Sequence, residues 1–246
     1  MKLSIVIPAY NESLNLPDTL NAFYTELKNC GIPHELLVVN DNSKDNTEQV
    51  LQELEQQIPT LRHVINTPPH NGFGYAVRKG LENFTGDCVA IVMADMSDSP
   101  ADLVKFYNTF IEKKVDCVFG NRFAKGGKVI DYPKKKLYLN RMVNNMISFI
   151  FKIRYNDCTN AFKLYSKETI NGVKPFMSPH FNLTVEIPLK AMVRGYTFAV
   201  VPNSWQNRKH GESNLKINEM GSRYFFIILY CLIEKYFSKG DFKKKW

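Results

Sequence analysis

Cysteine is scarce in this 246-residue sequence, and its spacing is irregular. The five cysteines are odd in number, lie far apart and form no C-x-x-C motif (Cys30, Cys88, Cys117, Cys158 and Cys231). Disulfide-rich secreted scaffolds and zinc ribbons need cysteines in pairs at short spacings, so the sequence favours neither class. A chain of this length can bury a sizeable core without such cross-links, and we expect it in a reducing cytosol.

Long hydrophobic runs are missing as well. The apolar run 3–7 is short, and Pro8 and then polar residues follow it at once, so we expect no signal peptide. The densest apolar stretch, 225–233, is far shorter than the roughly 18 residues that a bilayer crossing needs. The sequence therefore predicts no transmembrane helix.

Several motifs of nucleotide-binding and hydrolytic enzymes are absent. No phosphate-binding loop of the form G-x-x-x-x-G-K-[ST] occurs, and Val77 stands where a dinucleotide fingerprint beginning at Gly72 would need glycine. No serine lies in G-x-S-x-G, and the five histidines show no H-E-x-x-H spacing. P-loop enzymes, Rossmann dehydrogenases and serine hydrolases are therefore disfavoured.

Positive charge is in excess. The 32 Lys and Arg residues outnumber 24 Asp and Glu residues, and the resulting formal net charge of +8 favours anionic partners. Segment 122–141 holds seven cations and a single acidic residue, Asp131, and segment 239–246 adds four lysines. Such segments are also typical of solvated surface loops, so charge alone does not identify the partner.

Hydrophobic periodicity predicts an α/β fold. Short apolar runs in the first half are typical of strands buried on both faces, and amphipathic helical patterns separate them. The predicted strands are 3–7, 34–39, 62–66, 88–93 and 117–121. Right-handed crossovers between such units give a Rossmann-like, mostly parallel sheet flanked by helices. The second half predicts helices near 137–151 and 181–194, strands near 162–166 and 196–201, and a C-terminal helix, all within one domain.

Polar residues follow the predicted strands, at the edge where a parallel sheet binds ligands. Asp41 and Asp45 follow the second strand, and Asp95 and Asp98 follow the fourth. Carboxylates that converge on one rim suit Mg²⁺ or Mn²⁺ bridging a diphosphate. The first two are equally typical of turns and caps, and Asp98 of helix-terminus charge. Asp95 is therefore the strongest metal candidate.

An ordered series of motifs carries a family resemblance. Residues 5–12 (IVIPAYNE) and 35–47 (ELLVVNDNSKDNT) resemble the opening motifs of family 2 glycosyltransferases with the GT-A fold. Later motifs resemble the polyprenyl-phosphate branch, that is, dolichyl-phosphate mannose synthase-like enzymes (72–80, 120–123, 157–165 and 208–213). The series is more specific than any single motif.

The resemblance implies a domain organisation. It covers about residues 3–216, so a GT-A domain would span 1–216, with a nucleotide-sugar half at 1–123 and an acceptor half at 124–216. Residues 217–246 would then form an amphipathic, basic tail. The implied reaction is inverting transfer of a sugar from a nucleotide-diphosphate sugar to a polyprenyl (dolichyl or undecaprenyl) phosphate, with no nucleic acid involved.

The resemblance also implies roles for particular residues. Arg78 would help to order a pocket for the donor base and ribose, which Pro8, Ala9, Tyr10, Glu12 and Asp41 would line. Asp95, with Asp98 as a second candidate, would hold Mg²⁺ or Mn²⁺ on the diphosphate. The acceptor-phosphate ligands would be Arg122, Arg141, Arg208 and Ser213. Asp95, Arg122 and Arg208 would act in catalysis.

Three departures from the family pattern keep alternatives open. Met93 replaces the first aspartate of D-x-D, Asn40-Asp41-Asn42-Ser43 replaces D-D-G-S, and Asn214 replaces a lysine. The change at Met93 motivates a catalytically inactive carbohydrate-binding or lipid-phosphate-binding protein as one alternative.

The acceptor separates the remaining alternatives. A phosphate monoester is largely ionised at pH 7, so a polyprenyl phosphate needs no enzymic base. A sugar hydroxyl does need one, and Glu186 or Asp157 would be candidates. This second alternative is a nonprocessive family 2 transferase of cell-surface polysaccharide synthesis. The Q-x-x-R-W motif of processive synthases is not matched by Trp205-Gln206-Asn207-Arg208.

The C-terminal segment has two interpretations. Aromatic residues between Tyr224 and Trp246, beside Lys243-Lys244-Lys245, are typical of a helix that lies on an anionic membrane. A helix buried in the core is equally compatible. A polyprenyl acceptor requires such a surface or a membrane-embedded partner, and we therefore expect a cytoplasmic protein that is peripheral on the cytoplasmic face of a membrane.

Overall fold

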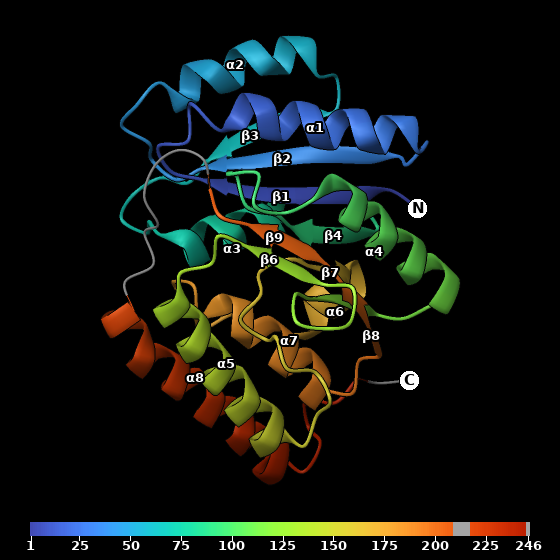
Figure 1. Cartoon of the computed structure of the whole chain (residues 1–246), viewed down its shortest axis with the longest axis vertical. Coiled ribbons are helices and arrows are strands. Elements are labelled where there is room, and N and C mark those ends of the chain that lie inside the picture. The colour runs from blue at the N-terminus through green and yellow to red at the C-terminus, as the bar shows by residue number, and fades with distance from the viewer. Residues whose placement is uncertain (209–216, 245–246) are drawn as a thin grey trace.

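The computed structural model describes residues 1–208 and 217–244, with the side chains of 217–220 excepted. Its central sheet has seven strands: β1 (Leu3–Ala9), β2 (His34–Asn40), β3 (Leu61–Ile65), β4 (Cys88–Ile91), β5 (Cys117–Asn121), β7 (Lys163–Ser166) and β8 (Phe198–Pro202). Their order is β3-β2-β1-β4-β7-β5-β8 (Figure 1). All neighbours pair in parallel except β7, which runs antiparallel to β4 and β5.

Helices cover both faces of this sheet. On one face lie α1 (Leu16–Asn29), α2 (Thr47–Gln57) and α4 (Pro100–Lys113), and on the other α3 (Phe73–Asn83), α6 (Lys167–Gly172) and α7 (Leu183–Val193). Two long helices, α5 (Lys134–Phe151) and α8 (Ile217–Phe237), lie side by side against α7 (Figure 1). The short strands β6 (Lys128–Ile130) and β9 (Ser204–Gln206) form a separate parallel ribbon.

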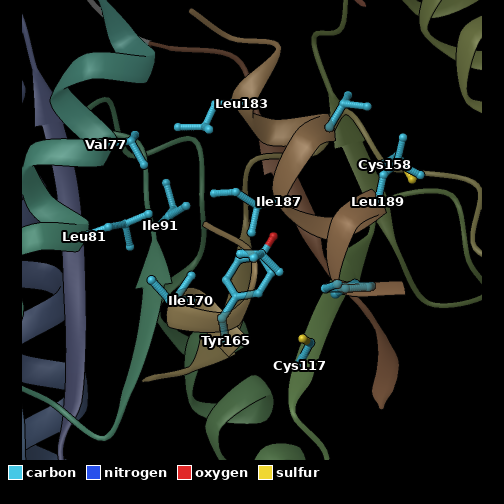
Figure 2. Packing of buried hydrophobic residues seen from close by; sticks show 14 of the residues in the cluster. Val77, Leu81, Ile91, Cys117, Cys158, Tyr165, Ile170, Leu183, Ile187 and Leu189 are labelled. Atoms are coloured by element: carbon cyan, nitrogen blue, oxygen red, sulfur yellow. The ribbon is translucent and has the colours of Figure 1, made fainter. Parts of the chain in front are cut away.

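The strand period of two divides the interior into two hydrophobic cores. Ile5 and Ile7 of β1 pack in the core that contains α1 and α4, whereas Val6 points to the opposite face and packs with α3. Figure 2 shows this second core, in which Val77 of α3 and Ile187 of α7 converge on the sheet. Both faces of the sheet are therefore buried under helices, as the nearly continuous apolar sequence of the strands predicts.

The predicted mostly parallel, helix-flanked α/β sheet is confirmed. The strands of the first half lie within about two residues of their predicted ends. β4 stops at Ile91 because the Met93 amide donates to the Asp98 carboxylate (3.1 Å) and the chain leaves the sheet there. Periodicity does not predict α6, β6 and β9, because elements of three to six residues are too short to show a period.

The C-terminal helix α8 has one buried face and one exposed face. Ile227, Ile228 and Cys231 are buried in the core that contains α7, and both guanidinium contacts of Arg194 to the Glu234 carboxylate are short (2.7 and 2.8 Å). The buried-helix interpretation therefore holds for this face. No helix within the described residues is both long and apolar enough to cross a bilayer.

His63 of β3 joins the edge of the sheet to α2. Its Nδ1 lies 2.7 Å from Glu55 Oε1 and its Nε2 2.9 Å from Glu48 Oε1. Burial alone lowers the pKa of His63, but the two carboxylates outweigh it and hold the pKa above its ordinary value. Glu48 in turn accepts a hydrogen bond from the Asn40 amide (2.7 Å), at the end of β2. The His63 imidazole thus supports, through Glu48, the loop that follows β2.

We expect this contribution to stability to depend on pH. A histidine whose pKa is raised by folding stabilises the native state below its unfolded pKa of roughly 6.5, and that stabilisation is lost as pH rises through the folded value. His63→Gln should therefore reduce the free energy of unfolding by about 1 to 2 kcal/mol at pH 6 and by clearly less at pH 9. Urea unfolding at both pH values measures the difference, and an equal loss at both would contradict the charged pair.

Candidate active site

A cavity of about 810 Å³ opens at the carboxyl ends of β1, β2, β4 and β5. Its polar part is lined by side chains that follow these strands. A second part is lined by apolar side chains of α5 and α8 (Leu139, Val143, Met146, Phe225 and Ile228). The cavity therefore joins a charged strand edge to an apolar space between two helices.

The structure brings most of the predicted site residues together. The cavity is lined by Pro8, Ala9, Tyr10, Glu12, Asp41, Asp95, Asp98, Arg122 and Arg208. Arg78 and Arg141 do not line it, and Ser213 lies outside the described residues. Arg78 instead lies over the Tyr75 ring on α3 (5.3 Å to the centroid).

Asp41 holds two segments of the first half of the chain together. Its Oδ1 accepts from the Asn66 amide and its Oδ2 from the Gly72 backbone N–H, both at 2.7 Å. This carboxylate thus ties the loop after β2 to the start of α3. Asp45 does not line the cavity, and the expectation that it joins the rim is wrong. Its carboxylate accepts from the backbone N–H and hydroxyl of Thr47 and so closes a turn directly before α2.

Asp95 and Arg208 form the central ion pair of the cavity. Arg208 Nη2 lies 2.8 Å from Asp95 Oδ2, and its Nη1 lies 3.5 Å from Glu12 Oε1. Burial raises the pKa of Glu12, whereas the Asn15 amide and the Arg208 charge lower it. One arginine thus bridges two carboxylates that would otherwise repel each other.

The residues beside Asp95 fit a divalent cation. The hydroxyl of Ser97 lines the cavity, is buried and has no hydrogen-bond partner, while the Ser97 N–H donates to Asp95 Oδ1 (3.1 Å). Across the part of the chain that the structure describes, no three His, Cys, Asp or Glu side chains cluster as a complete metal site. A cation at Asp95 would therefore draw its other ligands from Ser97 and the diphosphate, which suits Mg²⁺ or Mn²⁺.

Asp98 is placed differently from Asp95, although both line the cavity. Its Oδ2 accepts from the Met93 N–H (3.1 Å), and only 2% of the residue is exposed. Burial raises its pKa to about 7, against the opposing effect of that hydrogen bond. Asp98 is therefore less ionised at neutral pH and partly occupied by the backbone, which makes it the weaker metal candidate.

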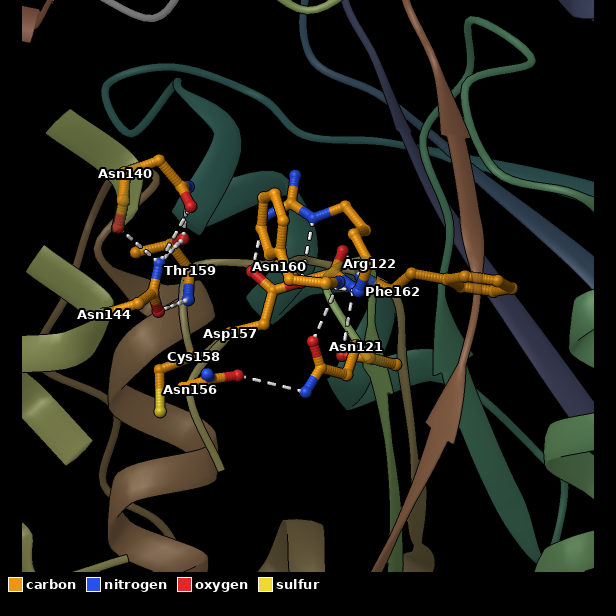
Figure 3. A network of polar contacts seen from close by, with 12 residues as sticks. Asn121, Arg122, Asn140, Asn144, Asn156, Asp157, Cys158, Thr159, Asn160 and Phe162 are labelled. Atoms are coloured by element: carbon orange, nitrogen blue, oxygen red, sulfur yellow. Dashed lines mark hydrogen bonds and ion pairs between the residues drawn. The ribbon is translucent and has the colours of Figure 1, made fainter. Parts of the chain in front are cut away.

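A bidentate pair positions Arg122 at the end of β5 (Figure 3). Its backbone N–H and Nε both donate to Asp157 Oδ2 at 2.9 Å, and its Nη2 donates to Oδ1 at 2.7 Å. Both residues are buried. Asp157 therefore fixes the guanidinium plane, and the remaining Nη1 is left for a ligand.

The segment that contains Asp157 also anchors α5. The Thr159 hydroxyl accepts from the side-chain amides of Asn140 and Asn144, both at 2.8 Å (Figure 3). Lys163, fully buried, donates to the carbonyl of Cys158 (2.9 Å) and to that of Asn160. Burial lowers the pKa of this lysine to about 8. The motif at 157–165 is thus a buried polar brace between the sheet and α5.

Glu186 and Asp157, the two carboxylates that the sequence offers as general bases, are both engaged in buried contacts within the protein. Glu186 is fully buried and accepts from the backbone N–H groups of Met177 and Ser178, both at 2.7 Å, and from Lys190. Asp157 is occupied by Arg122. Neither lines the cavity, so the expectation that one of them acts as a base on an acceptor hydroxyl is not supported.

Sequence reasoning missed several residues that line the cavity. Lys136 belongs to the basic run, but a run of lysines does not show which one faces inward. Ser97 follows Asp95 at i+2, and this spacing is a signal that was available. Tyr132 and Trp205 have rings 4.8 Å apart and bring the β6–β9 ribbon to the cavity wall, a contact between segments far apart in the chain.

Because Arg208 contacts Asp95, we expect its guanidinium and a divalent cation to compete for this carboxylate. A divalent cation that binds Asp95 must displace a guanidinium from 2.8 Å, so we expect Arg208→Gln to bind Mn²⁺ about tenfold more tightly than the parent. Electron paramagnetic resonance of free Mn²⁺ measures this without turnover. Arg141→Gln, which removes the same charge away from Asp95, is the control and should change little. Equal affinities in all three proteins would show that Arg208 does not compete.

Comparisons with known proteins agree with this geometry. The model of the family described as "Glycosyl transferase family 2" matches residues 4–173. The chain is 32% identical over 222 residues to a dolichol-phosphate mannosyltransferase of Pyrococcus furiosus, covering 88% of this chain and 60% of that protein. It is 26% identical over 216 residues to a polyprenol monophosphomannose synthase of Mycolicibacterium smegmatis, covering 86% of this chain and 80% of that protein.

Solved structures share the fold. A glucosyl-3-phosphoglycerate synthase of Mycobacterium tuberculosis, crystallised with Mn²⁺, uridine diphosphate and phosphoglyceric acid, matches with a TM-score of 0.71 at 17% identity. The match covers 94% of this chain and 78% of that one. The family model spans more than half of the sequence and includes the strand ends that form the charged side of the cavity. The chain therefore belongs to glycosyl transferase family 2.

Proposed function

We propose that this protein transfers a sugar from a nucleotide-diphosphate sugar to a polyprenyl phosphate, with inversion at the anomeric carbon. The observation that carries the proposal is the continuity of the cavity from the Asp95 edge to the apolar space between α5 and α8. A ligand for such a cavity has an anionic head and a hydrocarbon tail. The names of the two relatives support the same acceptor class, although the chain spans 60% of the archaeal relative.

The proposed reaction does not require a side chain of the protein to accept a proton. An acceptor phosphate oxygen attacks the anomeric carbon as the bond to the donor diphosphate breaks, and the nucleoside diphosphate leaves with the electron pair. A phosphate monoester is already largely ionised at pH 7, so no side chain must remove a proton. The displacement of Glu186 and Asp157 from the cavity is compatible with this demand and unfavourable for a hydroxyl acceptor.

The residues of the cavity divide into donor and acceptor sides. Asp95 and Ser97 would hold Mg²⁺ or Mn²⁺, which neutralises charge on the departing diphosphate when it is bound. Tyr10 and Asp41 lie on the side of the donor base and ribose. Arg122, held by Asp157, presents its free Nη1 to the acceptor phosphate. We assign Arg141 an indirect role, because it donates to the Asn156 carbonyl (3.0 Å) and lies outside the cavity.

Enzyme turnover tests the roles proposed for Asp95 and Asp98. Asp95→Asn should lower the Mn²⁺-dependent rate by about 10² or more, because it removes charge that holds the metal at the leaving group. Asp98→Asn should lower it much less, because that carboxylate is committed to the Met93 N–H. The assay uses radiolabelled nucleotide-diphosphate sugars with polyprenyl phosphate or a sugar acceptor. Equal rates in parent and Asp95→Asn would refute the assignment, and product only with the sugar acceptor would refute the proposed acceptor.

The outer surface of α5 and α8 supports peripheral membrane binding. On α5, Tyr138, Met142 and Phe149 are 75%, 62% and 85% exposed, and they recur at helical spacing. On α8 the exposed apolar side chains are Phe225, Phe226, Leu229, Ile233, Tyr236 and Phe237. The two helices lie side by side (Figure 1), so these side chains extend over neighbouring helices. Aromatic and aliphatic surface of this kind enters the headgroup region of a bilayer.

The predicted role of the lysine tail needs correction. Lys244 donates to Asp116 Oδ1 (2.8 Å) and is largely buried, so its charge is used within the protein. Lys245 and Trp246 lie outside the described residues. Of the three lysines, Lys244 is therefore not available for membrane contact, and we take the apolar face as the main candidate for it. We infer attachment at the cytoplasmic face, where the unpaired cysteines also fit.

Vesicle binding tests this surface. A Met142→Gln/Phe149→Gln double variant should lose most co-sedimentation with vesicles that contain anionic lipid, because it removes apolar side chains that would enter the headgroup region. Ile111→Gln, on α4 and 39% exposed, is the matched control and should bind like the parent. Binding of the parent should also weaken with salt, given the net charge of +8. Unchanged binding of the double variant would exclude α5 from the contact.

A further inference from the structure

We propose that Glu48 of α2, held by His63 of β3, is a positioning residue for the nucleotide, and that through this pair nucleotide affinity follows the charge of an imidazole at the edge of the sheet. Neither residue lines the cavity, so both act through the loop that follows β2. The inference rests on the proposed function, because it concerns the nucleotide-diphosphate side of that reaction.

Asn40, the last residue of β2, links Glu48 to this loop. It is only 4% exposed. Its side-chain amide donates to Glu48 Oε2 (2.7 Å), and its Oδ1 accepts from the Ser43 backbone N–H (3.0 Å). An aspartate at position 40 could not donate to Glu48 and would repel it. The departure from the D-D-G-S pattern at this position is therefore what allows the contact with α2.

The loop carries this contact to the cavity. The Asn11 N–H donates to Ser43 Oγ (3.0 Å), and Asn11 Oδ1 accepts from the Lys44 N–H (2.8 Å). Asn11 lies between Tyr10 and Glu12, which both line the cavity. Its φ of 56° is in the left-handed region, which a residue other than glycine keeps only when surrounding contacts hold it. The loop therefore fixes the backbone between two lining residues.

The backbone of Asn40 provides a second connection. Its carbonyl accepts from the Asn66 N–H (2.9 Å), and the Asn66 side chain donates to Asp41 Oδ1 (2.7 Å). The Asp41 N–H in turn donates to the Ala9 carbonyl (2.8 Å), and both of these residues line the cavity. A shift of Asn40 would therefore move Asp41, which lies on the side assigned to the base and ribose.

His63 controls Glu48 because its imidazole lies between two carboxylates of α2. Its Nε2 lies 2.9 Å from Glu48 and its Nδ1 2.7 Å from Glu55. These are the charged groups that face it from α2, and β2 presents the apolar Val38 beside it. A charged imidazole donates to both carboxylates, whereas a neutral one donates to one and presents a lone pair to the other. Loss of the proton therefore weakens one of the two contacts.

The direction of the pH dependence follows from the same contacts. Burial lowers the pKa of His63, but the two carboxylates outweigh it and raise the pKa above its ordinary value. At pH 6 the imidazole is therefore charged and holds Glu48, and the contact weakens as pH rises through the folded pKa. A loop already held in its binding conformation costs less to order when the ligand arrives. His63 should therefore favour nucleotide binding at low pH and contribute little at high pH.

Calorimetry of nucleotide binding to the full chain tests this without turnover. The probes are the diphosphates of uridine, guanosine, adenosine and cytidine, each with Mg²⁺, at pH 6 and pH 9. His63→Gln should bind the tightest of them about fivefold more weakly than the parent at pH 6, and within about twofold of the parent at pH 9. Comparing the two proteins at each pH cancels the ionisation of the ligand and of the cavity carboxylates.

Arg62→Gln is the matched control. Arg62 precedes His63 on β3 and also holds a carboxylate, because its Nε donates to Glu35 (3.1 Å), but it does so on the opposite face of the sheet. This variant should bind like the parent at both pH values. Glu48→Ala removes the link itself and should bind more weakly at both. Glu55→Gln keeps an oxygen acceptor but loses a charge, so nucleotide affinity should fall at a lower pH than in the parent.

The outcomes separate the inference from the proposed function. If the parent binds a nucleoside diphosphate but His63→Gln differs from it equally at both pH values, or at neither, the inference is refuted and the proposed function stands. An equal loss in Arg62→Gln at pH 6 would also refute it, because the effect would then be one of general stability. If the parent binds none of the four nucleoside diphosphates at either pH, the proposed function and the inference are both overturned.

Discussion

The buried pair between Arg122 and Asp157 is the constraint on which the α5 side of the cavity depends. It joins the end of β5 to the segment before β7 by two side-chain hydrogen bonds and one from the backbone N–H. A single buried charge would be costly, so each partner requires the other. The segment so fixed then holds α5 through Thr159. Removal of this pair would leave both the guanidinium and the helix without a defined position.

The carboxylates of the cavity are partly compensated by a cation of the protein itself. The proposed reaction brings together two anionic substrates, yet carboxylates are prominent along the cavity wall. Arg208 resolves part of this conflict, because it bridges Asp95 and Glu12. A metal that replaces it on Asp95 would free its charge for the acceptor. The same side chain can therefore serve donor and acceptor in turn.

The two long helices, α5 and α8, contribute both to the cavity and to an exposed apolar surface. Their inner side chains line the cavity, and their outer apolar side chains face away from the protein. Under the proposed function the acceptor keeps its tail in the bilayer, so its phosphate would have to reach Asp95 along a path that begins at the membrane surface. Placing the apolar lining and the exposed apolar face on the same pair of helices makes this path short.

Local sequence determined the layered α/β fold, the approximate strand ends and the position of Asp95 just after β4, because period, strand length and motif order are properties of neighbouring residues. Most of the site residues that the sequence predicted do line the cavity. Only the tertiary structure decided which charged side chains form ion pairs. Arg208 meets Asp95, Arg122 meets Asp157 and Lys244 meets Asp116 across long separations in the chain. The rotation of α5 likewise turns Lys136 into the cavity and leaves Lys135 exposed. Pairing and burial depend on how distant elements pack, and no local pattern encodes that packing.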